Sequence, residues 1–280
     1  MTNEDGDEGD GAPVQQAAMT VEGLSRNRRL VRQIVGLAEN IPRYPVERLM
    51  QLGPLAEARR ICRVRVGWVA VFTKAYALVA RDAPVLRSWY VSGLWPRVAT
   101  APHSVASIAV SRTLEGTISA GDDVSSASIN CPVRHLPELY FAQVRSPDSM
   151  PLSELQKRIN RFSTDSVHDV FRRQRHLSML PTWLARTVLG WNVRSASLKR
   201  ATRFGTFSVS SLGAEQASNR FHPSFLTSSL TFSPLAIDGQ CLVTLICDHR
   251  LIDGVPAARA LAALERKLLG EIREELHQLA

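Results

Sequence analysis

The stretch "LICDHRLIDGVP", residues 245–256, joins an apolar run to a histidine and then to an Asp-Gly pair. In the overlapping segment "QCLVTLICDH" (240–249), apolar side chains occupy both alternating sets of positions, apart from one threonine. Because side chains alternate between the two faces of a strand, this run predicts an interior strand that is buried on both sides. His249 then stands at the tip of that strand, where the chain turns through Asp253 and Gly254 into a helix.

His249 is open to two interpretations. Buried histidines usually fill a hydrogen-bonding position in a core. At a strand tip, an imidazole can instead remove a proton from an attacking hydroxyl, thiol or amine near neutral pH, provided that its other nitrogen is held in the correct tautomer. Asp253 is close enough in sequence to shape the turn. We expect it to form an ion pair with an arginine of the basic segment "RNRRLVR" (26–32).

A second candidate lies on another predicted strand. An acyl-transfer site needs hydrogen-bond donors for the negative charge that develops on the carbonyl oxygen. The segment "GTFSVSSLG" (205–213) carries two adjacent serines near its end, Ser210 and Ser211. Because serine pairs are common turn formers, the pair alone indicates no more than a turn.

The remaining pattern predicts an α+β fold with a mixed sheet in the middle of the chain. Apolar spacing predicts helices that begin after Ser25, over 66–80, from Pro151 with a capping box of Ser153 and Gln156, and after Gly254 with a stop at Gly270. Segments rich in β-branched residues predict strands over 105–113, 126–133, 138–146, 205–213, 228–237 and 240–249. The basic segment 171–200, which Pro181 breaks, predicts helices packed on the domain, with a membrane-surface segment as the alternative.

Composition predicts one domain with an acidic tail. The chain has 280 residues and is 45% hydrophobic, and no linker-like segment divides its middle. Residues 1–20 hold five acids and no bases, which is the composition of a disordered segment, so the domain is assigned to 21–280. The whole chain carries 34 Lys and Arg against 26 Asp and Glu, and the domain without its tail is more basic still. This balance fits nucleic acid, a membrane surface or a phosphate-bearing small molecule as partner, or it reflects arginine-rich composition without a ligand.

The cysteines, the N-terminus and the known sequence motifs limit the possible classes of protein further. The four cysteines form no CxxC pair and have no histidine at zinc-ligand spacing, so we expect core packing and no metal site. The N-terminus is acidic and lacks an apolar signal segment, which together with free thiols favours the cytoplasm. The apolar run 66–80 contains Lys74 and is too short to span a bilayer comfortably. We find no phosphate-binding loop, dinucleotide-binding motif, zinc-protease motif or nucleophile elbow.

Two of these segments together resemble a known family, the 2-oxoacid dehydrogenase acyltransferases (dihydrolipoamide acyltransferases) with their relative chloramphenicol acetyltransferase. "CDHRLIDG" (247–254) is similar to the family's HxxxDG motif, and "GTFSVSSLG" (205–213) is similar to a strand of the dehydrogenase branch. The motifs occur in the family's order, and weaker similarity extends back to about Leu24. The resemblance implies a chloramphenicol acetyltransferase-like fold, a two-layer α/β sandwich in which helices pack on a mixed β-sheet.

The resemblance also implies catalytic roles. His249 would be the general base that deprotonates the acceptor, which attacks an acyl thioester directly. Ser210 would donate a hydrogen bond to the oxyanion. A positioned base contributes roughly 10²- to 10⁴-fold to the rate, and an oxyanion donor about 10²-fold or somewhat more.

Further residues would support the site. By the same resemblance, Asp253 would be structural and would pair with Arg28 or Arg29 of the opening helix, and Gly254 would complete the motif. The family is typically trimeric, with the histidine of one subunit facing the serine of its neighbour. We therefore expect a homotrimer or a multiple of trimers.

The expected function is that of a stand-alone acyltransferase. Residues 1–23 are too few to hold the lipoyl domain, the hinge and the subunit-binding domain that precede the catalytic domain in dehydrogenase complexes. We expect acyl-CoA or a carrier-bound acyl thioester as donor and a thiol, hydroxyl or amine as acceptor, with coenzyme A thioester as co-substrate and no covalently bound cofactor. The segments 112–137 and 214–239 depart from the family's pattern, so the residues that bind donor and acceptor stay unassigned.

Other function classes remain open at this point. A non-catalytic trimeric scaffold or assembly core would keep the fold without the reaction. Nucleic-acid binding is not expected, because no recognition helix, zinc finger or aromatic-basic pattern accompanies the charge. Association with a membrane surface through Trp183–Trp191 is a further variant of the enzyme hypothesis.

Overall fold

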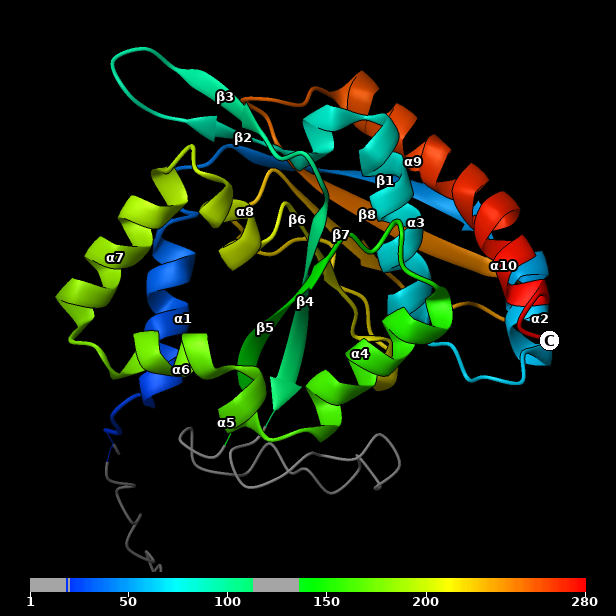
Figure 1. The fold of residues 1–280 in the computed structure, drawn as a ribbon, viewed down its shortest axis with the longest axis horizontal. Coiled ribbons are helices and arrows are strands. Elements are labelled where there is room, and N and C mark those ends of the chain that lie inside the picture. Colours follow the sequence, from blue (N-terminus) through cyan, green and yellow to red (C-terminus); the bar gives the residue numbers. More distant parts are fainter. Residues whose placement is uncertain (1–18, 20, 113–135) are drawn as a thin grey trace, which may run out of the picture.

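The computed structural model describes residues 19, 21–112 and 136–280. The described chain forms a six-stranded mixed sheet with helices packed on it and a separate two-stranded ribbon (Figure 1). The predicted α+β class is confirmed. The acidic tail at 1–20, apart from one residue, and the predicted strand at 126–133 lie outside the described residues.

The strands of the main sheet come from all parts of the chain. In spatial order they are β1 (Arg43–Gln51), β8 (Gln240–Asp248), β7 (Ser228–Phe232), β6 (Phe207–Ser210), β4 (Val105–Arg112) and β5 (Glu138–Arg145). β6 is parallel to β4 and to β7, and the other neighbours are antiparallel. β8 is thus an interior strand, as predicted, whereas the edge strand β1 has no counterpart among the predictions. The ribbon pairs β2 (Ser88–Val91) with β3 (Arg97–Thr100).

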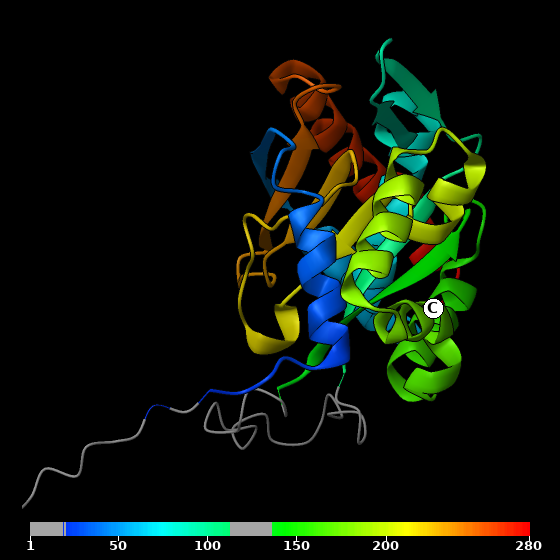
Figure 2. The same cartoon turned by 90° about the vertical axis from the view of Figure 1, so that its left-hand side faces the viewer.

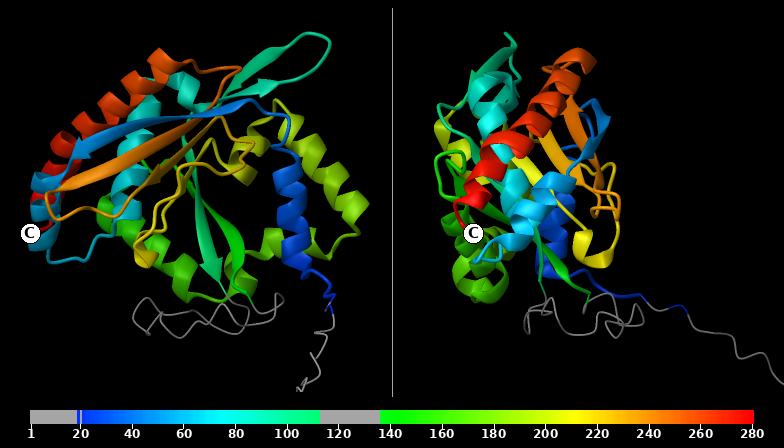
Figure 3. Two further views of the ribbon diagram at one scale, coloured as in Figure 1. Left: turned by 180° about the vertical axis from the view of Figure 1, so that it is seen from behind. Right: turned by 90° about the vertical axis from the view of Figure 1, so that its right-hand side faces the viewer.

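One group of helices covers one face of the sheet. It comprises α2 (Gly53–Ile61), α3 (Trp68–Asp82), α4 (Leu152–Thr164), α9 (Gly254–Lys267) and α10 (Arg273–His277). Seen from behind, β1 and β8 lie in front with no helix of the described chain over them (Figure 3). The central contact is aromatic, because Phe72 stacks on Phe232 with ring centroids 4.1 Å apart and Tyr76 meets Phe207 edge-on at 4.8 Å.

A second group of helices lies beside β4 and β5 (Figure 2). It comprises α1 (Arg26–Gly36), α5 (Val167–Val170), α6 (Arg172–Met179), α7 (Thr182–Arg194) and α8 (Leu198–Phe204), and short turns occur at η1 (Pro84–Arg87) and η4 (Gly213–Glu215). Ser25 caps α1 as predicted, because its hydroxyl accepts a hydrogen bond from the Arg28 amide at 3.0 Å. Pro181 separates α6 from α7, as expected of a residue that cannot continue a helix.

The predicted start of α4 at Pro151 is confirmed, but two other predicted features of helix ends are wrong. The capping box does not form, because Pro151 occupies the N-cap of α4 and the Gln156 side chain instead accepts a hydrogen bond from the Gly67 amide at 2.6 Å. The stop at Gly270 is also absent, because the chain continues through the π-helical turn η5 (Leu268–Ile272) into α10. Leu268, Ile272 and Leu276 continue one fully buried stripe, so burial outweighs the low helix propensity of a single glycine.

The sheet face opposite α3 and α9 is lined with small hydroxyl side chains in its centre. Ser208, Ser229, Thr231 and Thr244 are buried there. The hydroxyls of Ser208 and Ser229 are hydrogen-bonded to each other, and Ser229 Oγ lies 2.7 Å from Nε2 of His222. Burial, together with the nearby Arg43 guanidinium, lowers the pKa of His222 to about 4. The ring is therefore neutral at physiological pH.

The basic helical segment 171–200 has a membrane surface as its alternative partner. Every helix in 21–112 and 136–280 is too short or too polar to cross a bilayer. On α7, Trp183 and Trp191 are 70% and 80% exposed. Their role at a membrane surface stays a prediction.

Candidate active site

His249 follows the last residue of β8, at the end of an interior strand. Its backbone amide donates to the carbonyl of Pro42 at 2.9 Å, and the adjacent pair is Arg43 opposite Asp248. The edge strand β1 thus fixes the start of the histidine turn. The His249 side chain is 56% exposed, so a substrate can reach it.

The His249 ring is oriented by two neighbours. Its Nδ1 lies 3.1 Å from Oδ1 of Asp253, the N-cap residue of α9. The ring also lies against Tyr44, with centroids 4.6 Å apart. Burial raises the pKa of Tyr44 to about 12, so its hydroxyl stays protonated and donates to the carbonyl of Ile252 at 2.9 Å. Sequence reasoning missed Tyr44, because it lies two hundred residues away on the unpredicted strand β1.

The sequence predicts an ion pair between Asp253 and an arginine of the opening helix. Within one chain this prediction is wrong. Arg28 donates to the carbonyl of Pro137 at 3.1 Å, and in the described part of the chain neither Arg28 nor Arg29 contacts Asp253. The reason is position, since the first turn of α1 lies beside β5, at the other edge of the sheet from β1. At Gly254, a Cβ would meet no atom within 4 Å, so space in one chain does not require glycine there.

The serine pair lies at the far end of its strand. Ser210 ends β6 and is half-buried, and the Ser211 hydroxyl accepts a hydrogen bond from the Gly213 amide at 3.2 Å, as a turn former does. At the start of the same segment, Gly205 has φ +94°, and a Cβ there would lie 2.9 Å from Cβ of Ser107. That position therefore requires glycine.

His249 and Ser210 do not meet within one chain. Ser210 is opposite Thr231, which is opposite Thr244 on β8, and His249 follows Thr244 by five residues. At about 3.4 Å per residue, their backbones are roughly 17 Å apart along the strands, before the width of two strand spacings is added. Side chains of a serine and a histidine cannot bridge that distance.

Cys247, two residues before His249, is not a second nucleophile. It is fully buried, and burial raises the pKa of its thiol to about 12. A neutral thiol in the core is unreactive. Core packing, which the sequence predicts for the cysteines, accounts for Cys241 as well, which is also buried.

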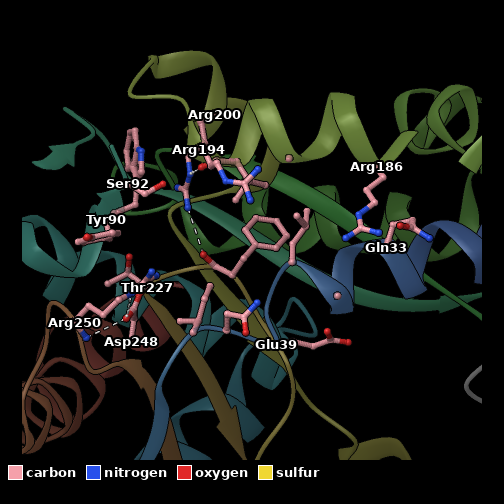
Figure 4. Close-up of a pocket in the computed structure, with 18 of the residues that line it drawn as sticks. Gln33, Glu39, Tyr90, Ser92, Arg186, Arg194, Arg200, Thr227, Asp248 and Arg250 are labelled. Atoms are coloured by element: carbon pink, nitrogen blue, oxygen red, sulfur yellow. Dashed lines mark hydrogen bonds and ion pairs between the residues drawn. The ribbon is translucent and has the colours of Figure 1, made fainter. Parts of the chain in front are cut away.

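On the opposite side of the strand tip, Asp248 and Arg250 line a cavity of about 480 Å³ (Figure 4). Asp248 is buried and binds Arg250 through both carboxylate oxygens, with the shortest contact at 2.6 Å. Arg200 from α8 forms part of the wall and covers the ring of Trp89 at 4.7 Å. Burial lowers the pKa of Arg200 to about 9, although the charge of Asp248 opposes that shift. Sequence reasoning missed this group, because its members come from several distant segments.

A second cavity, of about 520 Å³, lies at the other end of the sheet beside Ser211. Its walls include the apolar side chains of Trp68, Phe72, Phe232 and Leu235. The two cavities therefore lie near the two separated motifs and differ in character, one lined with arginine and one largely apolar.

Comparisons with known proteins identify the fold. No family model matches the chain, and no curated protein matches it in sequence. Among solved structures, it is similar to a probable dihydrolipoamide acetyltransferase from Listeria monocytogenes 4b F2365, with 16% identity, a TM-score of 0.56 and 91% and 94% of the two chains covered. It is also similar to dihydrolipoamide acetyltransferase from Azotobacter vinelandii, with 17% identity, a TM-score of 0.58 and 94% and 96% covered.

A third similar structure is a truncated catalytic core of the 2-oxoacid dehydrogenase multienzyme complex from Thermoplasma acidophilum, with 14% identity, a TM-score of 0.58 and 90% and 99% of the two chains covered. Similarity therefore extends over nearly all of this chain and over whole catalytic cores. The resemblance inferred from the two sequence motifs is confirmed for the fold. The chain has the fold of the catalytic cores of dihydrolipoamide acetyltransferases.

Proposed function

We propose that this protein is an acyltransferase that moves an acyl group from a thioester to a thiol, hydroxyl or amine, with His249 as the general base. The observation that carries the proposal is the exposed imidazole at the end of β8, whose Nδ1 lies 3.1 Å from Asp253. When Nδ1 donates its proton to the carboxylate, Nε2 is the unprotonated nitrogen that accepts a proton.

The fold shared with acetyltransferase cores supports this reaction class. The Azotobacter structure belongs to an investigation of a serine, a histidine and an asparagine in that enzyme's catalytic mechanism, and there the asparagine follows the histidine by four residues. Asp253 follows His249 at the same spacing.

The proposed step balances without a further reactant. Nε2 of His249 takes the proton of the acceptor, the acceptor atom bonds to the carbonyl carbon, and the carbonyl electron pair moves onto oxygen. When that intermediate collapses, the carbon–sulfur bond breaks and the imidazolium returns its proton to the leaving thiolate. A base in this position accounts for roughly 10²- to 10⁴-fold of the rate.

We infer that the complete site includes Ser210 of a second copy of the chain. The separation of Ser210 from His249 within one chain supports this inference, because an oxyanion donor must lie about 3 Å from the reacting oxygen. A closed ring of copies with head-to-tail contacts supplies one such pairing at each interface. A trimer, the assembly expected from the sequence resemblance, meets this requirement.

The cavities agree with a thioester donor. The apolar cavity beside Ser211 suits an acyl chain, since its wall is formed by Trp68, Phe72, Phe232 and Leu235. The basic balance of the chain suits a donor with phosphate groups, so acyl-CoA is the first donor to test and an acyl-carrier protein the second.

The first experiment compares the wild type with His249→Ala, using a panel of acyl-CoA and acyl-carrier donors with dihydrolipoamide, other thiols, alcohols and amines as acceptors. We expect release of the free thiol from the donor to fall by roughly 10²-fold or more in the variant. The matched control is His277→Ala, which removes an exposed histidine on α10. Equal rates for wild type and His249→Ala would refute the proposed base.

The second experiment tests the shared site. Ser210→Ala and His249→Ala are co-expressed with different tags, and mixed assemblies are purified through both tags. Each variant alone is expected to be impaired. In the mixed trimers selected by both tags, about a third of the interfaces combine an intact serine with an intact histidine, so activity returns in part. Mixed assemblies no more active than the single variants would exclude a site built from two copies.

A further inference from the structure

The arginine-lined cavity beside β8 is not needed for the proposed proton transfer. Because successive side chains of a strand point to opposite faces, Asp248 and His249 face different sides of the strand tip. The cavity lies between α1, α7, α8 and the end of β8 (Figure 4). Its charged lining residues are Arg32, Arg186, Arg194, Arg200 and Arg250, with the carboxylates Glu39 and Asp248.

The positive charge of this cavity is not balanced within the described chain. Asp248 is already bound through both oxygens by Arg250. Among the lining residues, Glu39 is then the one other carboxylate, and it faces four guanidinium groups, those of Arg32, Arg186, Arg194 and Arg200. In 21–112 and 136–280, no ion pair within 4.0 Å joins Arg186, Arg194 or Arg200 to a carboxylate.

Arg200 is the buried member of the group. Its side chain is only 3% exposed, and it donates to the carbonyls of Val193 and Phe225 at 2.9 and 3.3 Å. Two neutral acceptors do not neutralise a buried cation, and the nearby Asp248 carboxylate offsets its burial only in part, so the pKa of Arg200 stays lowered. An anion in the cavity would supply the missing opposite charge.

Structural roles explain only part of this arrangement. Arg200 braces the α7–α8 connection and covers Trp89, and Arg194 lies in the last turn of α7, where the helix dipole favours a cation. Arg32 and Arg186 are exposed, and neither lies in the last turn of its helix. Exposed arginines can be solvated anywhere on the surface. Solvation therefore does not explain why Arg32 and Arg186 line the same cavity as Arg194 and Arg200.

We propose that this cavity binds a small molecule that carries two or more phosphate groups. Guanidinium groups match phosphate oxygens in planar, paired hydrogen bonds, and here they approach from three helices. The volume of about 480 Å³ lies within the usual range of small-ligand sites. The site does not depend on acyl transfer: it would serve the phosphate-bearing part of coenzyme A or a separate nucleotide.

The test is isothermal titration calorimetry of the full chain with pyrophosphate, ATP and coenzyme A as probes. The test variant is Arg186→Gln with Arg194→Gln. The matched control is Arg172→Gln with Arg173→Gln, which removes the same charge from exposed positions on α6 outside the cavity. We expect the test variant to bind at least one probe roughly tenfold more weakly or worse than the control.

A further variant leaves every arginine in place. Ser92 is exposed at the cavity wall, and Ser92→Glu adds a carboxylate there. We expect it to weaken the same probe, which guards against a folding defect in the double variant. Circular dichroism and thermal melting check that all variants are folded.

Competition separates the two sources of the phosphate groups. Displacement of coenzyme A by pyrophosphate or ATP would mean that the cavity holds the phosphates of coenzyme A. Independent binding of ATP or pyrophosphate would mean a separate phosphate ligand, and either result supports the site. Absence of binding by all three probes, or equal loss in the test and control variants, would overturn the proposal. His249→Ala is expected to keep probe binding, so failure of the proposed catalysis and failure of this site are distinguishable.

Discussion

Replacing His222 by glutamine isolates one source of acid sensitivity in the fold. Burial and the Arg43 charge lower the pKa of His222 to about 4, whereas a histidine in the unfolded chain titrates near 6.5. As pH falls below about 6.5, the unfolded chain binds a proton at His222 that the folded chain does not bind. Stability is therefore lost as pH falls from about 6.5 towards 4, and the contribution is fully present above that window.

The size of this effect follows from the difference in pKa. A difference of about 2.5 units is worth about 3.4 kcal/mol when titration is complete, at about 1.36 kcal/mol per unit. The ring is only partly buried, and at about pH 4.5 the titration of His222 is not yet complete. We therefore expect a loss of about 2 to 3 kcal/mol in the free energy of unfolding at this pH. Glutamine places an amide near the former Nε2, so Ser229 keeps a hydrogen-bond partner.

The assay is urea unfolding of wild type and His222→Gln at about pH 7.5 and about pH 4.5. We expect the variant to lose less free energy of unfolding between the two values, by about 2 to 3 kcal/mol. Other titrating groups are common to both proteins and cancel in the difference. His277→Gln, at an exposed histidine, serves as control and should behave as the wild type. An identical pH dependence in wild type and His222→Gln would refute the reasoning.

Two further predictions concern the backbone and the histidine turn. Gly239→Ala should destabilise the fold by about 2 kcal/mol or more, because φ is +80° and a Cβ would lie 2.8 Å from Cα of Gly53; an unchanged urea midpoint would contradict this. Tyr44→Phe removes the hydrogen bond to the carbonyl of Ile252 and should cost about 1 kcal/mol of stability. It should also lower kcat several-fold with little change in KM, because it loosens the turn that orients His249; steady-state kinetics measure this, and an unaltered kcat would argue against a positioning role.

The sequence predicts the local parts of this fold well. The alternation in 240–249 locates an interior strand, and the histidine at its tip lies where that pattern places it. The strand pattern depends on residues that are close together in the sequence, so the periodicity of apolar residues is enough to predict it. The edge strand β1 escapes because "RYPVERLMQ" mixes a proline and charges with apolar residues, and much of an edge strand faces solvent.

The sequence does not predict which residues far apart in the chain come into contact. The expected partner of Asp253 is an arginine of the opening helix, but the fold carries the first turn of that helix to the opposite edge of the sheet. The contact that forms joins Asp253 to His249, four residues away. The arginine-lined cavity is not predicted for the same reason, since Arg32, Arg186 and Arg250 come together only in the folded chain.

The alternation at the end of β8 restricts how this segment can evolve. Because strand side chains alternate with a period of two, inserting or deleting one residue within 243–248 would exchange the two faces. The carboxylate of Asp248 would then point to the side from which His249 is reached, and the imidazole would enter the arginine-lined cavity. Substitutions can accumulate along this strand one at a time, whereas a change in its length would disable both sides of the strand tip in a single event. Homologues should therefore differ in length in the 213–227 connection and keep the strand length unchanged.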